Sequence, residues 1–324
     1  MFFLRVKMFL LLAVLFAILY MIVTIIGVQM GITNFYFYLI ISLFLMYIQY
    51  LIGPKIVEWS MHIKYVDRKE APELHQIVDS LIEKANIPKP KIGISPTYLP
   101  NAFAFGHGLR SGRVCVTQGI LRLLNHNELR AVLAHEISHL KNRDVLTITI
   151  LSVIPMILYR IAWHMFWFGG GRRRDSRGTN TALIGLLAFI FYFITNLLVL
   201  YASRIREYFA DRGSVKLGNH PSWLATALYK LVYGSARIDK EELREIEGLK
   251  AFFVNDPSKA LHEIYELKQL DLDMSGTIDP NELEVIRTRR IRLGFADKLM
   301  ELLSTHPNML KRIKQLSVTS NSSQ

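Results

Sequence analysis

Hydrophobic residues run without interruption over long stretches near the N-terminus. From Met8 to Pro54 the chain has no charged residue, and a turn-like polar patch at residues 29–34 divides this stretch into two runs. Each run holds about 20 residues, enough for a helix to cross a bilayer core of about 30 Å. Residues 1–54 are therefore predicted to form a transmembrane hairpin. A cleaved signal peptide is the alternative, but the apolar stretch is too long for one and a second span follows at once.

A second apolar region occupies residues 146–202. Its two runs, Leu146–Phe168 and Thr181–Ala202, are joined by an arginine-rich loop. Arg160 and His164 in the first run need a cavity or neighbouring helices around them. We predict two crossings of the membrane. In the alternative, the pair only dips into the membrane and the basic loop stays inside. Both arrangements return the chain to the side that it left.

In the remaining segments, apolar residues recur among polar ones at the spacings typical of amphipathic helices and short strands. Residues 72–86 repeat apolar side chains at helical spacing, and residues 92–94 and 113–117 read as short strands. Arg5 and Lys7 precede the first apolar run and place the N-terminus in the cytoplasm. The polar segments that follow the hairpin are therefore predicted to lie in the cytoplasm as well.

Residues 135–139 read H-E-I-S-H and carry the strongest chemical signal in the chain. A capping box at residues 125–128 and apolar residues at helical spacing predict that they lie on a helix. His135 and His139 then share one face and can bind one metal ion, for which zinc is well suited. Glu136 projects beside the metal, where it can take a proton from water. A surface helix that carries two histidines by chance is the alternative.

A catalytic zinc commonly has three protein ligands and an open fourth position, so a further ligand is needed. Glu207 and Asp211 follow the last apolar run and would point the same way from a helix. Glu207 can bind zinc, and Asp211 can accept the outer N–H of a ligand histidine. Their spacing alone leaves open the alternative of a charged face at the end of a membrane helix.

Residues 101–106 alternate small and aromatic side chains between Pro100 and Gly108. This pattern fits an exposed strand that could bind a peptide by β-addition, and the alternative is an ordinary packed hairpin. The candidate substrate-binding residues are Asn101, Ala102, Phe103 and Ala104.

Together these motifs resemble the HtpX family of membrane-integrated zinc metalloproteases. The H-E-x-x-H motif and the acidic pair after the second apolar region fit the family pattern. An N-A-F-A-x-G segment at residues 101–106 and two C-terminal blocks, at residues 251–255 and 304–307, fit it as well. The blocks occur in the family's order, and the resemblance runs from the N-terminal hairpin to about Leu316.

The resemblance implies a function and a role for each site residue. Zinc would be bound by His135, His139 and Glu207, with Glu136 as the base and His306 near the substrate carbonyl. The substrates would be polypeptides, namely membrane or misfolded proteins, cleaved at the cytoplasmic face of the cell membrane.

The predicted fold class is mainly α. The chain is expected to be a multi-pass membrane protein whose α+β, zincin-like catalytic domain has a small sheet and is interrupted by a membrane hairpin. Four parts are predicted: an N-terminal transmembrane hairpin (1–54), the first part of the catalytic domain with the H-E-x-x-H helix (55–145), a second membrane hairpin (146–202) and the second part of the catalytic domain (203–324).

Residues 271–282 have no counterpart in the HtpX pattern and match a 12-residue EF-hand calcium loop. Gly276 stands where the sharp turn of such a loop needs glycine, and residues 260–270 and 280–291 can form the flanking helices. A polar connector between two helices is the alternative. The candidate calcium ligands are Asp271, Asp273, Ser275, Thr277, Asp279 and Glu282.

Composition agrees with a membrane protein, because 51% of the 324 residues are hydrophobic. The net charge of +12 could indicate nucleic-acid binding, but the sequence contains no nucleic-acid-binding module. Membrane topology and anionic lipid surfaces explain the basic residues better, so membrane lipid is the expected partner. Cys115 is the single cysteine, which excludes an intramolecular disulfide, and its valine neighbours indicate a buried thiol.

The sequence thus predicts a zinc metalloendopeptidase with one zinc per chain. A CAAX-prenyl-protease-like enzyme shares the zinc motif, but that family has about seven spans and this chain offers at most four. A calcium-responsive membrane scaffold with a structural zinc is the alternative from another class. A structural zinc would need four protein ligands, and three can be named.

Overall fold

The computed structural model describes residues 34–168, 177–236, 267, 270–288 and 294–319. The chain divides into two compact units, Met1–Ile52 with Leu151–Leu198 and Gly53–Ile150 with Val199–Gln324. We call the first the apolar unit and the second the polar unit. The four-part organisation predicted from the sequence stays a prediction, because residues 1–33 lie outside the described part of the chain.

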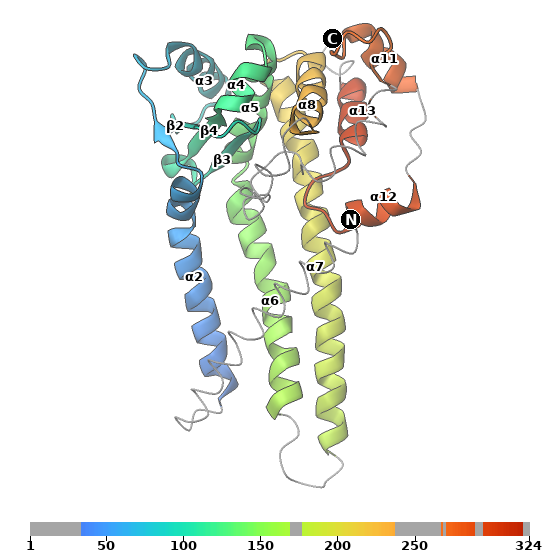
Figure 1. Cartoon of the computed structure of the whole chain (residues 1–324). Coiled ribbons are helices and arrows are strands. Elements are labelled where there is room, and N and C mark those ends of the chain that lie inside the picture. The colour runs from blue at the N-terminus through green and yellow to red at the C-terminus, as the bar shows by residue number, and fades with distance from the viewer. Residues whose placement is uncertain (1–33, 169–176, 237–266, 268–269, 289–293, 320–324) are drawn as a thin grey trace. The chain divides into compact units, whose positions relative to one another are not determined.

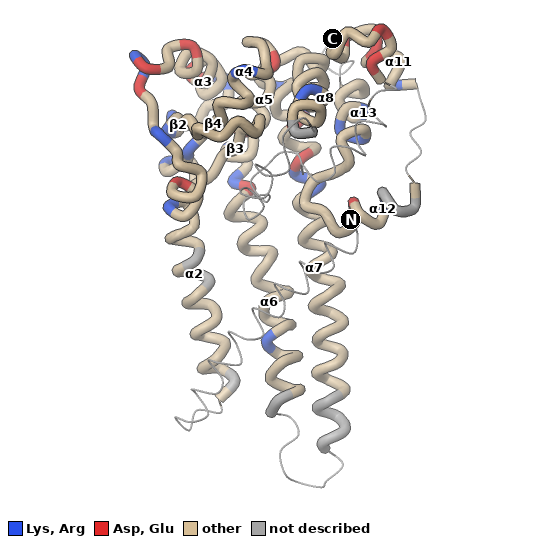
Figure 2. The backbone as a smooth tube through the Cα atoms, in the orientation of Figure 1, with Lys and Arg blue, Asp and Glu red and all other residues tan. Residues whose placement is uncertain are grey.

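The apolar unit is built from parts of three long helices, α2 (Phe35–Ser60), α6 (Asp144–Phe168) and α7 (Arg177–Lys216) (Figure 1). Each contains a stretch long and apolar enough to cross a membrane, and within the described residues these are the three helices that do. Figure 2 shows that charged residues are sparse along them. The apolar runs predicted to span are confirmed as helices of this kind, except for the first, which lies outside the described residues.

Large apolar side chains of these helices remain exposed, among them Phe44, Ile154 and Leu198, each more than half exposed. Extensive apolar exposure of this kind is expected where lipid surrounds a helix. Within the apolar unit, α6 and α7 touch through Tyr159 and Tyr192, whose ring centroids lie 5.3 Å apart.

The helix α7 is 40 residues long and continues without a break past the predicted boundary at residue 202. It can do so because no glycine or proline occurs between Gly185 and Gly213 to interrupt it. The apolar span and the segment with Glu207 and Asp211 are therefore parts of one helix.

The polar unit contains a four-stranded sheet in the order β1-β2-β4-β3 (Figure 1). Its strands are β1 (Lys64–Tyr65), β2 (Lys91–Ser95), β3 (Ala102–Phe105) and β4 (Arg113–Thr117). The central pair, β2 and β4, is parallel, and both outer strands pair antiparallel. The two short strands predicted at residues 92–94 and 113–117 are the two central ones, and the strand predicted at residues 101–106 is β3. The two-residue β1 was too short to give a pattern.

The sheet packs against helices that contribute the main core of the polar unit. α3 (Pro72–Ala85) lies between β1 and β2 in the chain, α4 (Gln118–Leu123) and α5 (His126–Lys141) follow β4, and α3 contacts α5. The C-terminal half adds α8 (Pro221–Ala236), α11 (Pro280–Thr288), α12 (Phe295–Leu302) and α13 (Met309–Thr319). Contacts of α8 with α5 and α13 bring the two halves of the sequence together.

The strand β3 corrects one expectation. It lies at an edge of the sheet, as a peptide-binding strand should, but it is not exposed, because Ala102 is fully buried and Phe103 is 6% exposed. Phe103 packs in a small hydrophobic cluster with Val57 and Met61 from the end of α2 and the segment that follows it, and Ala102 packs in the main core. Both faces of the strand are therefore covered, and its free part is the backbone edge.

Candidate metal centre

The helix α5 presents two imidazoles side by side. It begins with the predicted capping box, in which the side chains of Asn125 and Glu128 each accept a hydrogen bond from the other residue's backbone N–H. Its apolar face is fully buried in the core. His135 and His139 project together, with their Nε2 atoms 3.1 Å apart. The nitrogens of the buried His135 and the partly buried His139 face each other so closely that they need a shared proton or a cation between them.

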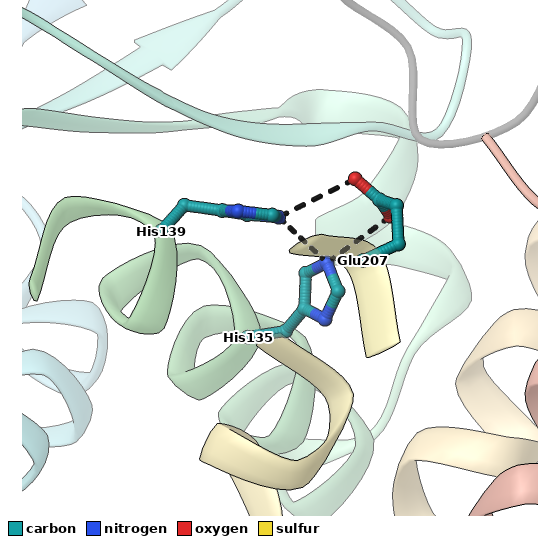
Figure 3. Close-up of side chains that lie close together, drawn as sticks. All are labelled: His135, His139 and Glu207. Atoms are coloured by element: carbon teal, nitrogen blue, oxygen red, sulfur yellow. Dashed lines mark hydrogen bonds and ion pairs between the residues drawn. The ribbon is translucent and has the colours of Figure 1, made fainter. Parts of the chain in front are cut away.

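Glu207, on α7, completes a triangle with the two imidazoles (Figure 3). Its Oε2 lies 3.6 Å from Nε2 of His135, and its Oε1 lies 3.5 Å from Nε2 of His139. Ligands at 2.0–2.1 Å from a tetrahedral zinc are about 3.3–3.4 Å from one another. The three separations in this triangle are close to that value, so the site fits a zinc ion.

Each imidazole also meets a carboxylate at its other nitrogen. Asp211 Oδ1 lies 2.9 Å from Nδ1 of His135, and Asp144 Oδ2 lies 2.5 Å from Nδ1 of His139. Such contacts fix the tautomer and orientation of a ligand histidine and leave Nε2 free for a metal. The sequence pointed to Asp211 but not to Asp144. The only local signal for Asp144 is its place one turn beyond the H-E-x-x-H motif, at the start of α6.

Each of these two carboxylates forms an ion pair with a buried or half-buried arginine. Arg312, on α13, is fully buried, and its Nη2 and Nε lie 2.6 and 3.0 Å from the two carboxylate oxygens of Asp211. Its Nη1 lies 3.1 Å from Oε2 of Glu207. Arg206 forms an ion pair with Asp144. Arg312 stands 101 positions after Asp211, so no local pattern could have indicated it.

The charges of the site favour a cation where the donor atoms meet. Burial opposes ionisation of Glu207, but His306 and Arg312 hold its pKa well below the usual value. Burial also opposes protonation of His135, yet its hydrogen bonds with Asp211 and Glu207 raise its pKa to about 9. Oε2 of Glu207 is buried and makes no hydrogen bond of good geometry with the described residues. That atom is suitably placed to bind a metal.

Glu136 lies beside this triangle and is 5% exposed. Its Oε2 accepts a hydrogen bond of 2.9 Å from the backbone N–H of Ala104, on β3. Burial raises the pKa of Glu136, and the nearby His135 and His139 oppose that rise. A carboxylate with a raised pKa is a stronger base, which suits a group that must remove a proton near neutral pH.

His306 reaches the same place from the segment that follows α12. Its Nδ1 lies 3.3 Å from Oε1 of Glu207. The buried Arg204 holds this segment, because its Nη1 donates hydrogen bonds of 2.8, 3.0 and 2.7 Å to the carbonyls of Glu301, Leu302 and Ser304. The structure thus brings His306, which the resemblance placed near the substrate, to the metal centre.

The predicted substrate strand lies along one side of the site. Asn101 is fully buried, its N–H donates to Oγ1 of Thr117, and its carbonyl accepts from the N–H of Thr117. Because alternate residues of an edge strand bond to the neighbouring strand, the backbone groups of Ala102 and Ala104 face the free edge. The N–H of Ala104 points to Glu136, so this edge lies next to the candidate base.

The loop at residues 271–282 is folded around its own acidic side chains. Ligand oxygens of Asp271, Asp273 and Glu282 lie within 4.8 Å of one another. Asp271 accepts hydrogen bonds from the N–H groups of Ser275 and Gly276, and Glu282 accepts from those of Leu272 and Asp279. The exiting helix α11 begins at Pro280, as predicted, whereas most of the predicted entering helix lies outside the described residues.

The same loop is anchored on α8. Oγ1 of Thr226 donates to the carbonyl of Ile278 and accepts from its N–H, at 3.0 and 2.9 Å. The hydroxyl of Tyr229 donates to Asp271 at 2.9 Å. The described residues contain no second EF-hand loop that could pair with this one. The hydrogen bonds from α8 hold the loop in place instead.

Comparisons with known proteins identify a family and relatives of this chain. The model of the family described as peptidase family M48 matches residues 68–320. A protein named protease HtpX homolog from Methanothermobacter thermautotrophicus is 48% identical over 229 residues, which cover 71% of this chain and 86% of that protein. A protease HtpX homolog from Moorella thermoacetica is 39% identical over 273 residues, which cover 83% of this chain and 79% of that protein.

One solved structure is also similar. It is the crystal structure of Ste24p from S. mikatae, with 18% sequence identity and a TM-score of 0.49. The match covers 94% of this chain and 63% of the Ste24p chain.

Proposed function

Because the chain belongs to peptidase family M48 and is a membrane protease of the HtpX type, we propose that it is a zinc-dependent endopeptidase of protein quality control. Its substrates would be membrane or misfolded proteins, cleaved at the cytoplasmic face of the cell membrane. One observation carries the zinc assignment: two Nε2 atoms and a carboxylate converge with separations of 3.1, 3.5 and 3.6 Å, close to the edges of a tetrahedron around zinc.

In this proposal each side chain of the site has a separate role in peptide hydrolysis. A zinc held by the triangle would polarise the scissile carbonyl and activate a water molecule for attack. Glu136 would take a proton from the attacking water and pass it to the leaving amine. Asp211 and Asp144 would keep both imidazoles in the tautomer that leaves Nε2 free. His306 would donate a hydrogen bond to the carbonyl oxygen as negative charge develops there.

The substrate would lie extended along the free edge of β3. The outward backbone groups of Ala102 and the outward carbonyl of Ala104 support this placement, because they can bond to a peptide strand next to Glu136, which accepts a hydrogen bond from the N–H of Ala104. Binding along a strand edge fits substrates that are locally unfolded. The cytoplasmic orientation is supported by Arg5 and Lys7 ahead of the first apolar run.

The test is the substitution Glu136→Gln in the purified full-length protein. We expect it to retain about one zinc per chain and to lose at least 100-fold in cleavage of casein, because a positioned general base contributes about 10²–10⁴ in rate. Zinc would be counted by mass spectrometry of the metal, and cleavage followed on gels. Undiminished cleavage by a zinc-loaded Glu136→Gln protein would refute the mechanism.

Two other functions are distinguishable by the same assays. A CAAX-prenyl-protease-like enzyme would cleave a prenylated peptide in preference to casein. A scaffold with a structural zinc would bind the metal and cleave neither substrate. What supports catalysis over a structural role is that the described residues offer three side-chain ligands, which leaves one position of a tetrahedral zinc open.

We also propose that residues 271–282 bind calcium. The support is the order of oxygen-bearing residues along the loop and the approach of Asp271, Asp273 and Glu282 to within 4.8 Å. Calorimetric titration of the full chain with Ca²⁺ should give a signal that Glu282→Gln removes, because this residue would supply two oxygens. The absence of binding at millimolar calcium would reject the proposal without affecting the zinc assignment.

A further inference from the structure

A basic cavity opens on the surface of the polar unit, and none of its lining residues belongs to the metal-binding triangle. It has a volume of about 480 Å³, and its lining includes His107, Arg110, Ser111 and Arg143. The loop after β3 supplies the first three, and the turn between α5 and α6 supplies Arg143. The described residues that line it include no acidic side chain.

The two arginines of this cavity are exposed. No carboxylate of a described residue lies within ion-pair distance of either guanidinium. An arginine keeps its charge at any physiological pH, and its planar group matches the oxygens of a phosphate. Two such groups around one cavity form a binding site for an anion that carries several oxygens.

The position of Arg143 in the chain indicates where that anion comes from. Arg143 directly precedes Asp144, the first residue of a helix long and apolar enough to cross a membrane. Large exposed apolar side chains begin two residues later, with Val145 43% exposed and Ile150 59% exposed. A basic residue directly before such a stretch lies at the level of the lipid headgroups.

We propose that this cavity binds the phosphate of an anionic phospholipid headgroup. Bound lipid would hold the end of α5 at the membrane surface, and α5 carries both histidines of the metal centre. The proposal does not depend on the protease activity, since it rests on the charges of the cavity and on its place next to a membrane helix.

The test uses the full-length protein in detergent, with bound lipid counted by native mass spectrometry as phosphatidylglycerol or phosphatidylcholine is added. We expect the wild type to retain phosphatidylglycerol in preference to phosphatidylcholine. Each basic side chain near an anionic surface strengthens the attraction by about fivefold, so Arg110→Ala with Arg143→Ala should weaken phosphatidylglycerol binding by about 25-fold.

Two further variants control for charge and for folding. Lys69→Ala with Lys216→Ala removes the same charge from exposed sites of the polar unit that do not line the cavity, and should leave lipid binding unchanged. Arg110→Lys with Arg143→Lys keeps the charge and should retain most of the binding.

Three outcomes would overturn the proposal. The first is equal phosphatidylglycerol binding by the wild type and by the Arg110→Ala, Arg143→Ala protein. The second is binding of inorganic phosphate in the cavity with no preference for phosphatidylglycerol, which would mean a free anion. The third is a change in the cleavage of acidic peptides by the double variant while lipid binding stays the same, which would make the cavity a peptide subsite.

Discussion

The metal centre on α5 and α7 and the loop at residues 271–282 each gather three chelating side chains, yet they satisfy them in opposite ways. In the loop, the oxygens of Asp271 and Glu282 accept hydrogen bonds from backbone N–H groups of the same loop. In the metal centre, the Nε2 atoms of His135 and His139 face each other at 3.1 Å, and Oε2 of Glu207 has no hydrogen bond of good geometry among the described residues.

This difference determines what each region needs. Because backbone N–H groups of the loop already bond to its carboxylates, we expect the loop to keep its conformation with or without a bound cation. A bound ion would stabilise the loop but would not be required for its folding. Nitrogen and oxygen atoms with lone pairs that converge in a site largely shielded from water are costly unless a proton or a cation joins them. The metal centre is therefore expected to depend on its ion, and the loop is expected to tolerate the loss of a ligand.

The largest effect should come from exchanging one ligand in each region. We expect Glu207→Gln to reduce bound zinc from about one per chain to a trace and to abolish casein cleavage, because a neutral amide binds zinc poorly. Glu282→Gln is the matched change in the loop and should leave both zinc content and cleavage as in the wild type. Full zinc occupancy in Glu207→Gln would remove the contrast between the two regions.

The next effect concerns Arg312, which supports the metal centre from α13. Removing one member of a buried ion-pair network costs about 3–5 kcal/mol, because the remaining carboxylates of Asp211 and Glu207 are left uncompensated. We expect Arg312→Ala to lower the free energy of unfolding by that amount in urea titrations followed by tryptophan fluorescence.

The control for Arg312 is Arg287→Ala, on α11, where an exposed pair with Glu284 is removed. Such pairs contribute about 0.2–1 kcal/mol. Similar losses for the two alanine variants would show that the guanidinium of Arg312 does not neutralise the buried carboxylates.

Which features the sequence could reveal depends on whether the residues involved are close together or far apart in the chain. The capping box, the H-E-x-x-H spacing and the acidic pair Glu207 and Asp211 are all local patterns, since residues four apart on a helix share a face. These patterns are sufficient to indicate the three zinc donors and Glu136. The two central strands and the long apolar helices were equally visible, because their patterns extend over several residues.

The features that escaped prediction are those that depend on packing between distant segments. Arg312 and Arg204 each bond to a residue about a hundred positions away in the chain, Asp211 and Ser304 respectively. The residues next to each arginine give no indication of this contact. The burial of β3 depends on residues at the end of α2, which alternation of small and aromatic side chains could not reveal. Asp144 was missed because its approach to His139 depends on the turn between the end of α5 and the start of α6, which helical spacing does not predict.

A smaller effect on zinc affinity is expected from the carboxylates that orient the imidazoles, and none from the acidic residues of the loop. We expect Asp144→Asn to weaken zinc binding by about 10- to 100-fold, because carboxylates at the outer nitrogen of a ligand histidine contribute that much to affinity. Zinc competition with a chromophoric chelator measures this change. Asp273→Asn, which removes an exposed carboxylate of the loop, should leave zinc affinity unaltered. Equal zinc affinities for wild type and Asp144→Asn would mean that His139 is oriented by packing alone.

The smallest effect concerns the backbone of the loop. Gly276 has a φ of +78°, and no atom lies within 4 Å of the position that a Cβ would occupy, so a side chain there meets conformational strain without a clash. We expect Gly276→Ala to cost about 1 kcal/mol and Gly276→Asn less, because asparagine tolerates the left-handed region better. Hydrogen exchange should quicken for the N–H groups of Ser275 and Gly276, which bond to Asp271, and stay unchanged in α5. If exchange in α5 quickened as well, the loop would be coupled to the metal centre through α8, and the two regions would not be independent.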